Sequence, residues 1–263
     1  MYVVDFNPIA IELGPVAIRW YALAYLAGFI GGWYYLKQLV TAKNLPLTYQ
    51  HLDDFLTYAI AGVLLGGRLG YILFYQSDYY ISHPLRIFYL WEGGMSFHGG
   101  LVGIILAILL FARHKKLDPF MVGDLIAVAG PIGLFFGRIT NFINGELWGR
   151  VTSHPWGMIF PHAGPEPRHA SQLYEAGLEG LLLFTILWYM AWRTNALQHP
   201  GRLGGVFLLG YAFSRFAVEF VREPDAQLGF LYAGATMGQL LCLPMALFGL
   251  WVLLRSLRQN NPS

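Results

Sequence analysis

The chain has 263 residues, of which 56% are hydrophobic and only 12% are charged. A soluble domain carries about 25% charged residues, so this composition excludes an ordinary soluble domain and is typical of an integral membrane protein. The formal net charge is only +2 and the basic residues are scattered, which excludes a surface built for nucleic acid.

Apolar residues come in seven blocks, each about as long as the roughly 20 residues that a helix needs to cross the hydrocarbon layer. The predicted spans are Val16–Leu36, Leu52–Tyr75, Met95–Ala112, Phe120–Ile139, Leu173–Trp192, Leu203–Val221 and Phe230–Leu254. Because the spans follow one another closely, we expect an all-α, polytopic helix bundle that forms a single membrane domain over residues 1–263. Two outer segments are inserted between spans, an arm-like segment at 76–94 and a small head at 141–171.

Basic residues follow alternate spans. They are Lys37, Lys43, Arg113, Lys115, Lys116, Arg193, Arg202, Arg255 and Arg258. Lys and Arg in short loops stay on the cytoplasmic side, so we expect the amino terminus outside and the carboxyl terminus in the cytoplasm. No basic segment precedes the first apolar block, which is therefore predicted to be a retained span and not a cleaved signal.

Several polar side chains lie inside these spans, where a charge is costly unless it is paired or faces water. With the orientation above, six of them share one depth, in the outer leaflet: Tyr21, Arg68, His98, Arg138, Arg215 and Glu219. The sixth span carries polar residues at spacings of four, four and three, which predicts that they share one helical face. These residues are Tyr211, Arg215, Glu219 and Arg222.

The arginines at this depth outnumber the acids. The arginines are Arg68, Arg138, Arg215 and Arg222. Glu219 is one acidic partner, and Glu146, just beyond the fourth span, is a second. The surplus is cationic, so we expect an anion to join these side chains. A salt bridge that only fixes helix packing is the alternative interpretation of an Arg–Glu pair inside a membrane.

Glycine-rich sequences flank Arg68, His98 and Arg138. Small residues let helix backbones approach closely, so these three side chains are expected to come together, although plain helix packing explains most of the glycines equally well. His98 lies within GGMSFHGG at 93–100, where the four glycines leave its ring little covered.

The chain contains no motif for a metal, a nucleotide or a serine nucleophile. Ser96 is not part of G-x-S-x-G, because position 98 is histidine. There is no H-E-x-x-H, paired-cysteine or P-loop sequence, so neither a metal nor a cofactor is implied. Cys242 is the only cysteine, which excludes a disulfide within the chain and predicts a buried, inert thiol.

The strongest local signal is GRITNFINGELWGR at 137–150, which leaves the fourth predicted span and carries Arg138, Asn141, Asn144, Glu146 and Arg150. Together with HGGLVG at 98–103, this sequence resembles the prolipoprotein diacylglyceryl transferase family. Further similarities lie in Trp20-Tyr21, GGRLGY at 66–71, RHASQLYE at 168–175 and FSRFAVEFVREPDAQ at 213–227. The resemblance therefore covers nearly the whole chain.

The resemblance implies a transferase that moves the diacylglyceryl group of phosphatidylglycerol to the lipobox cysteine in the signal peptide of a prolipoprotein. The reaction forms a thioether and releases glycerol phosphate, as the first step of bacterial lipoprotein maturation. The implied location is the bacterial plasma (inner) membrane, with the active site toward the outer face. The expected partners are phosphatidylglycerol, the precursor and membrane lipids, and no nucleic acid.

By motif matching, Arg138 and Arg215 are expected to contact the phosphate, each with a bidentate guanidinium fork. His98 is expected to act as general base for the cysteine thiol, whose ordinary pKa near 8.5 leaves it mostly protonated at neutral pH. The substrate-binding set implied by the resemblance is Tyr21, Arg68, Arg138, Asn141, Asn144, Glu146, Tyr211, Glu219 and Arg222. Within this set, Glu219 is expected to orient Arg215 or Arg222. For Arg68, a structural role is the alternative to substrate binding.

Three other interpretations stay open. A transporter of an anionic lipid would also gather arginines, although it should place its site at the midplane between broken helices in matched halves. A scaffold protein would explain a salt bridge but not the cationic surplus. A different phospholipid-dependent transferase is the nearest alternative, because the charges alone do not name the acceptor.

Overall fold

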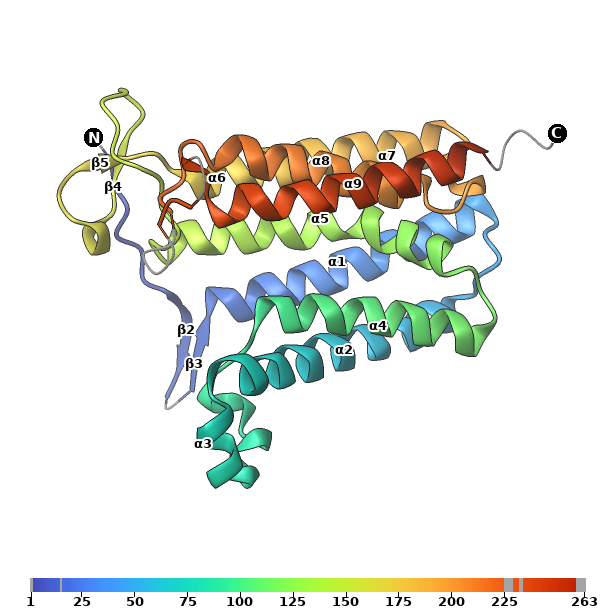
Figure 1. Cartoon of the computed structure of the whole chain (residues 1–263), viewed down its shortest axis with the longest axis horizontal. Coiled ribbons are helices and arrows are strands. Elements are labelled where there is room, and N and C mark those ends of the chain that lie inside the picture. The colour runs from blue at the N-terminus through green and yellow to red at the C-terminus, as the bar shows by residue number, and fades with distance from the viewer. Residues whose placement is uncertain (1, 15, 225–228, 232–233, 259–263) are drawn as a thin grey trace. The chain divides into compact units, whose positions relative to one another are not determined.

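The computed structural model describes residues 2–14, 16–224, 229–231 and 234–258 (Figure 1). Two compact units can be distinguished. The larger contains Met1–Tyr35 and Asp124–Ser263, and the smaller contains Leu36–Gly123. The predicted single membrane domain accordingly stays a prediction.

The smaller unit is a helical hairpin with an inserted arm. Helices α2 (Tyr49–Tyr75) and α4 (Phe97–Lys115) pack against each other along their lengths. The arm between them consists of α3 (Ser77–Ser82) and two 3-10 turns, η1 (Pro84–Phe88) and η2 (Leu90–Glu92). Helix α2 begins where Thr48 accepts a hydrogen bond from the backbone of His51, which satisfies one of the unpaired N–H groups at a helix start.

Glycines bring α2 and α4 together. A Cβ added at Gly66 would lie 2.4 Å from the carbonyl oxygen of Gly99, and one added at Gly62 would lie 2.5 Å from that of Gly103. Backbones this close gain van der Waals contact that any larger side chain would prevent. The close helix approach predicted from these glycine-rich sequences is confirmed for this pair of helices.

The larger unit contains five long helices, one short helix and a π-helix. They are α1 (Trp20–Lys43) and α5 (Pro119–Ile143), which both extend into the smaller unit, α6 (Ser171–Glu175), the π-helix η4 (Ala176–Leu182), α7 (Leu183–Arg193), α8 (Arg202–Val218) and α9 (Met237–Arg258). The short turn η5 (Ala196–Gln198) connects α7 to α8, and Figure 1 shows α8 and α9 side by side.

A small head of strands and loops stands at one end of the larger unit (Figure 1). Strand β1 (Tyr2–Val3) pairs parallel with β4 (Met158–Ile159), which pairs antiparallel with β5 (Pro167–Arg168); η3 (Pro161–Ala163) lies between the last two. Val4, Phe160 and Ala170 form its buried core. The head predicted at 141–171 thus also recruits the amino-terminal strand.

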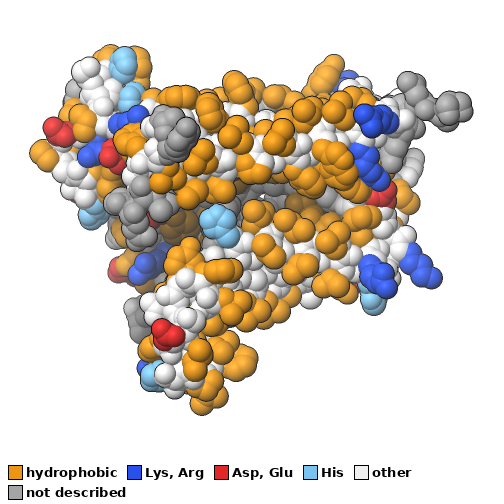
Figure 2. Space-filling view, in the orientation of Figure 1, with side chains coloured by type: hydrophobic (Ala, Val, Ile, Leu, Met, Phe, Trp, Pro, Cys, Tyr) orange, Lys and Arg blue, Asp and Glu red, His pale blue; other side chains and the backbone are white. Residues whose placement is uncertain are grey.

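Five helical segments among the described residues are long and apolar enough to cross a membrane: Tyr49–Tyr75, His98–Lys115, Pro119–Ile143, Ser171–Arg193 and Met237–Arg258. The other two predicted spans fall on α1 and on α8, which has only 17 residues. Hydrophobic side chains cover the lengths of the helices, whereas Lys and Arg gather at the ends (Figure 2). The chain is therefore a polytopic, mostly helical membrane protein.

Two predicted span boundaries are wrong. The first span was expected from Val16, but Val16–Arg19 form strand β3, which pairs with β2 (Ile9–Leu13) in a hairpin. A short apolar run does not by itself distinguish a strand from a helix. The seventh span was expected from Phe230, but α9 begins at Met237, after the N-cap residue Thr236.

Candidate active site

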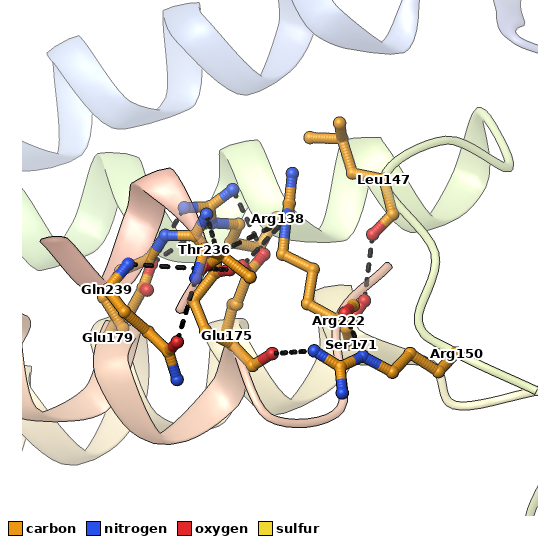
Figure 3. Close-up of polar contacts among 11 residues, drawn as sticks. Arg138, Leu147, Arg150, Ser171, Glu175, Glu179, Arg222, Thr236 and Gln239 are labelled. Carbon is orange, nitrogen blue, oxygen red and sulfur yellow. Dashed lines mark hydrogen bonds and ion pairs between the residues drawn. The ribbon is translucent and has the colours of Figure 1, made fainter. Parts of the chain in front are cut away.

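Three arginines and three glutamates form one ionic cluster inside the larger unit (Figure 3). Arg138 comes from α5, Glu175 from α6, Glu179 from η4 and Arg215 from α8, and Glu219 and Arg222 follow the end of α8. The cluster thus joins four helical elements of the unit through charged side chains.

Glu175 lies at the centre of the ionic cluster. Its Oε1 accepts hydrogen bonds from Nη1 of Arg215 at 2.7 Å and from Nη1 of Arg222 at 3.1 Å. Its Oε2 lies 3.1 Å from Nη1 of Arg138, without hydrogen-bond alignment. The Glu175 side chain is fully buried. One carboxylate therefore brings three guanidinium groups together.

The other two glutamates each orient one arginine more closely. Oε2 of Glu179 accepts hydrogen bonds from Nε and Nη2 of Arg138, at 3.2 and 3.0 Å. Glu219 forms an ion pair with Arg215 and accepts a hydrogen bond from the hydroxyl of Thr236. The prediction that Glu219 has an arginine partner on α8 is consistent with this pairing, although its role in catalysis is a proposal below.

The prediction that Arg222 lies on the polar face of the sixth span is wrong. Helix α8 ends at Val218, and Arg222 pairs with Gly149 of the head in an isolated β-bridge. The head draws the backbone out of the helix, because the N–H of Arg150 bonds to the carbonyl oxygen of Val221 at 2.8 Å. Arg222 still reaches the ionic cluster through its long side chain.

The expectation of a cationic surplus is also wrong for the described residues. Glu175 and Glu179 are both 0% exposed and balance the arginines, so that three positive charges face three negative ones. Both glutamates lie inside the predicted span Leu173–Trp192. The cost of a charge at membrane depth, which singled out the arginines, applied to them equally and could have found them.

A second group of three side chains, the polar triad, joins α1 to the segment that follows α5. The hydroxyl of Tyr21 donates to Oε1 of Glu146 and accepts from Nδ2 of Asn141. The same Nδ2 donates to Oε1 of Glu146 at 2.9 Å. Nε2 of Gln172 holds the segment by donating to the backbone oxygen of Glu146 at 2.6 Å. Three of the predicted site residues are therefore in direct contact.

Three further polar residues named in the sequence analysis lie near the ionic cluster or the polar triad: Tyr211, Asn144 and Arg150. Tyr211 on α8 is within electrostatic range of Arg138 and Glu179. Asn144 has a buried Oδ1 without a hydrogen-bond partner among the described residues. Arg150 donates through Nη2 to the backbone oxygen of Glu219 at 3.1 Å, which ties the head to the end of α8.

Arg68 belongs to the smaller unit and is 3% exposed. Its guanidinium lies 5.1 Å from the ring centre of Tyr80 and donates to carbonyl oxygens of the arm. The acceptors are Arg86, Ile87, Tyr89, Gly93 and Gly94. Arg68 thus fixes the shape of the arm from inside the hairpin.

His98 lies in the first turn of α4, in the smaller unit. The preceding Ser96 caps this helix, because its hydroxyl accepts a hydrogen bond from the backbone N–H of Gly99 at 3.2 Å. The His98 side chain is exposed. The imidazole of His98 is therefore accessible at a capped helix start.

The ionic cluster and the polar triad lie among apolar helices of the larger unit. The chain is therefore a membrane protein with a polar site among its helices. The sequence model of the prolipoprotein diacylglyceryl transferase family matches residues 8–255. The chain belongs to this family and is therefore a transferase.

Curated relatives named phosphatidylglycerol–prolipoprotein diacylglyceryl transferase match over almost the whole chain. The protein of Rhodospirillum centenum is 57% identical over 95% of this chain and 91% of its own length. The protein of Paramagnetospirillum magneticum is 56% identical over 97% of this chain and 95% of its own. The protein of Rhodopseudomonas palustris is 52% identical over 97% of this chain and 92% of its own.

Proposed function

We propose that the chain transfers the diacylglyceryl group of phosphatidylglycerol to the thiol of the lipobox cysteine of a prolipoprotein. The sulfur attacks the terminal glyceryl carbon, the bond from this carbon to the phosphate oxygen breaks, and glycerol phosphate leaves with the bonding electrons. A thioether forms, and the thiol proton passes to a base. The names of relatives with 52–57% identity support both substrates.

Arg138 and Arg215 are proposed to bind the phosphate. The observation that carries this assignment is that both guanidinium groups contact the same carboxylate, that of Glu175. Their side chains are 16% and 18% exposed, so an edge of each is accessible. Positively charged donors that are fixed before the reaction stabilise the negative charge that grows on a leaving phosphate.

His98 is proposed as the general base that takes the thiol proton. A thiol with an ordinary pKa near 8.5 attacks only as thiolate, so a base in contact with it accelerates the step at neutral pH. The exposure of His98 on a capped helix start supports this role. A variant His98→Gln should retain phosphatidylglycerol binding but lose most of the transfer rate below about pH 8.

The polar triad of Tyr21, Asn141 and Glu146 is proposed to hold the glycerol head group, with Asn144 beside it. Carboxylate and amide oxygens accept hydrogen bonds from hydroxyl groups, which a glycerol head group supplies. Glu219, Tyr211 and Arg222 are proposed to orient the phosphate-binding arginines. Arg68 is proposed to act through the arm, because its donors already contact the carbonyl oxygens of that segment.

We further propose that the amino terminus lies outside the plasma membrane, the carboxyl terminus in the cytoplasm and the site toward the outer face. The alternating basic loops support this orientation. Cys242 is buried, so a single exposed cysteine can be introduced as a reporter. An impermeant maleimide should label Ser153→Cys in intact cells and Asn195→Cys only after lysis; the reverse pattern would invert the orientation.

The function is tested by incubating the purified protein with phosphatidylglycerol and a lipobox peptide and measuring the peptide mass. The mass should rise by one diacylglyceryl unit, and a peptide with serine in place of cysteine should stay unmodified. Lipid consumption without a modified peptide would favour another phospholipid-dependent transferase. Movement of the lipid between leaflets of a vesicle without any chemical change would favour a transporter.

A further inference from the structure

Two carboxylates lie behind the arginines that are proposed to bind phosphate, on the side away from solvent. Glu175 and Glu179 are both 0% exposed, whereas Arg138 and Arg215 keep accessible edges. In Figure 3 both glutamates point into the group of guanidinium nitrogens. Neither carboxylate is in a position to touch a lipid head group directly.

The charge balance of the ionic cluster bears on how an anion is bound. Each arginine already faces at least one glutamate oxygen within 3.1 Å or closer. An incoming phosphate therefore shares each guanidinium with a carboxylate that repels it. A like charge nearby weakens binding of an anion, while it also holds the cation in place.

The two glutamates have unequal tasks. Glu175 contacts three arginines and joins Arg138 to Arg215 and Arg222. Glu179 bonds to Arg138 alone and uses only Oε2, while its Oε1 is buried without a hydrogen-bond partner among the described residues. Glu179 therefore controls the orientation and the effective charge of one arginine.

The π-helix η4 places Glu179 where it can reach Arg138. Single turns of π-helix are rare and occur mainly at functional sites. Gly180 follows directly, and a Cβ added there would lie 2.7 Å from Cβ of Phe135 on α5. Gly177, one turn earlier, has nothing within 4 Å of such a Cβ. The close approach of η4 to α5 thus depends on Gly180 and not on Gly177.

We infer that Glu175 and Glu179 are positioning residues of the transferase: they fix the phosphate-binding arginines and, by their negative charge, keep the glycerol phosphate product from being held too tightly. The inference rests on the proposed function. The released phosphate monoester carries one more negative charge than the diester, so that without the carboxylates an arginine cluster would retain the product more strongly than the substrate.

The test is steady-state transfer by the purified full chain in detergent, with glycerol phosphate added as inhibitor. For Glu179→Gln we expect kcat to fall about tenfold and the inhibition constant of glycerol phosphate to fall about tenfold as well, because one repelling charge is gone. For Glu179→Asp, which keeps the charge on a shorter side chain, kcat should fall with an unchanged inhibition constant.

The matched control is Glu223→Gln, since Glu223 pairs with Arg168 at 3.0 Å outside the ionic cluster and its side chain is 47% exposed. Both constants should stay at the values of the unchanged chain. If Glu179→Gln does not accumulate, three other variants test the inference. Glu179→Asp and Gly180→Ala should lower kcat, whereas Gly177→Ala should leave kcat unchanged.

An unchanged or raised inhibition constant in folded Glu179→Gln would overturn the inference, as would a Glu179→Asp variant with full kcat. Failure of the proposed function looks different, because the unchanged chain would then leave the lipobox peptide unmodified.

Discussion

Tyr21 donates a hydrogen bond to Glu146, although the two residues are 125 positions apart in the sequence. Asn141 bonds to both and completes the polar triad. The start of α1 is thereby fixed to the segment that leaves α5, next to the arginine at the end of that helix. The triad, which we propose to bind the glycerol head group, therefore lies near Arg138, which we propose to bind the phosphate.

Replacement of Tyr21 by Phe removes the hydroxyl and keeps the ring. A hydrogen bond to a charged group contributes about 1.5–3 kcal/mol, so the transfer rate at low lipid concentration should fall at least about tenfold. Tyr25→Phe is the control, because Tyr25 stacks on Tyr21 at 6.4 Å and is 64% exposed. Equal rates for both variants, measured by the mass of the modified peptide, would remove the triad from the site.

The α2–α4 hairpin should be sensitive to one methyl group at Gly66. A Cβ there meets the Gly99 carbonyl oxygen at 2.4 Å, and neither backbone can move without separating the helices. Overpacking of this kind costs about 1–3 kcal/mol, so Gly66→Ala should lower the thermal unfolding temperature clearly. Gly100→Ala should be tolerated, because its nearest neighbour would be the Val63 carbonyl oxygen at 3.8 Å. Equal melting curves would contradict the packing described.

Acid should destabilise the head through His169, which lies outside the candidate membrane spans, two residues before Ser171–Arg193. Burial, and to a lesser degree the nearby His154, lower the pKa of His169. The unfolded chain therefore binds the proton more tightly than the folded chain. The free energy of unfolding is highest above about pH 6.5 and decreases as the pH falls below that value. His169→Gln should reduce the drop in melting temperature between about pH 7.5 and 5.5. The control is His162→Gln, at an exposed histidine, which should leave the drop in melting temperature unchanged. An unchanged drop in His169→Gln would contradict this explanation.

Much of the site could be predicted from the sequence because charges at membrane depth are rare and conspicuous. Arg138, Arg215 and Glu219 were found in this way and do meet in the ionic cluster. Asn141 and Glu146 were identified through the motif at 137–150 and Tyr21 through its depth and the Trp20-Tyr21 pair, and the three side chains are in contact. The glycine-rich sequences correctly predicted the close packing of α2 and α4.

What the sequence did not reveal depends on contacts between distant segments. Glu175 and Glu179 lie in a span that is otherwise mostly apolar, and the π-helix that carries Glu179 cannot be recognised from periodicity. Arg222 continues the helical spacing of α8, but pairing with Gly149 ends the helix earlier. The strand at Tyr2–Val3 joins the head only because β4, far along the chain, offers it an edge.

The most direct test of the account is the mass of a lipobox peptide after incubation with phosphatidylglycerol and each of three folded variants, Arg138→Lys, Arg215→Lys and Arg193→Lys. Lysine keeps the charge but loses the bidentate fork, so transfer by the first two should fall about 100-fold or more. Arg193 is exposed at the end of α7, and its variant should modify the peptide fully. Full modification by Arg138→Lys or Arg215→Lys would contradict the claim that these two guanidinium groups hold the phosphate.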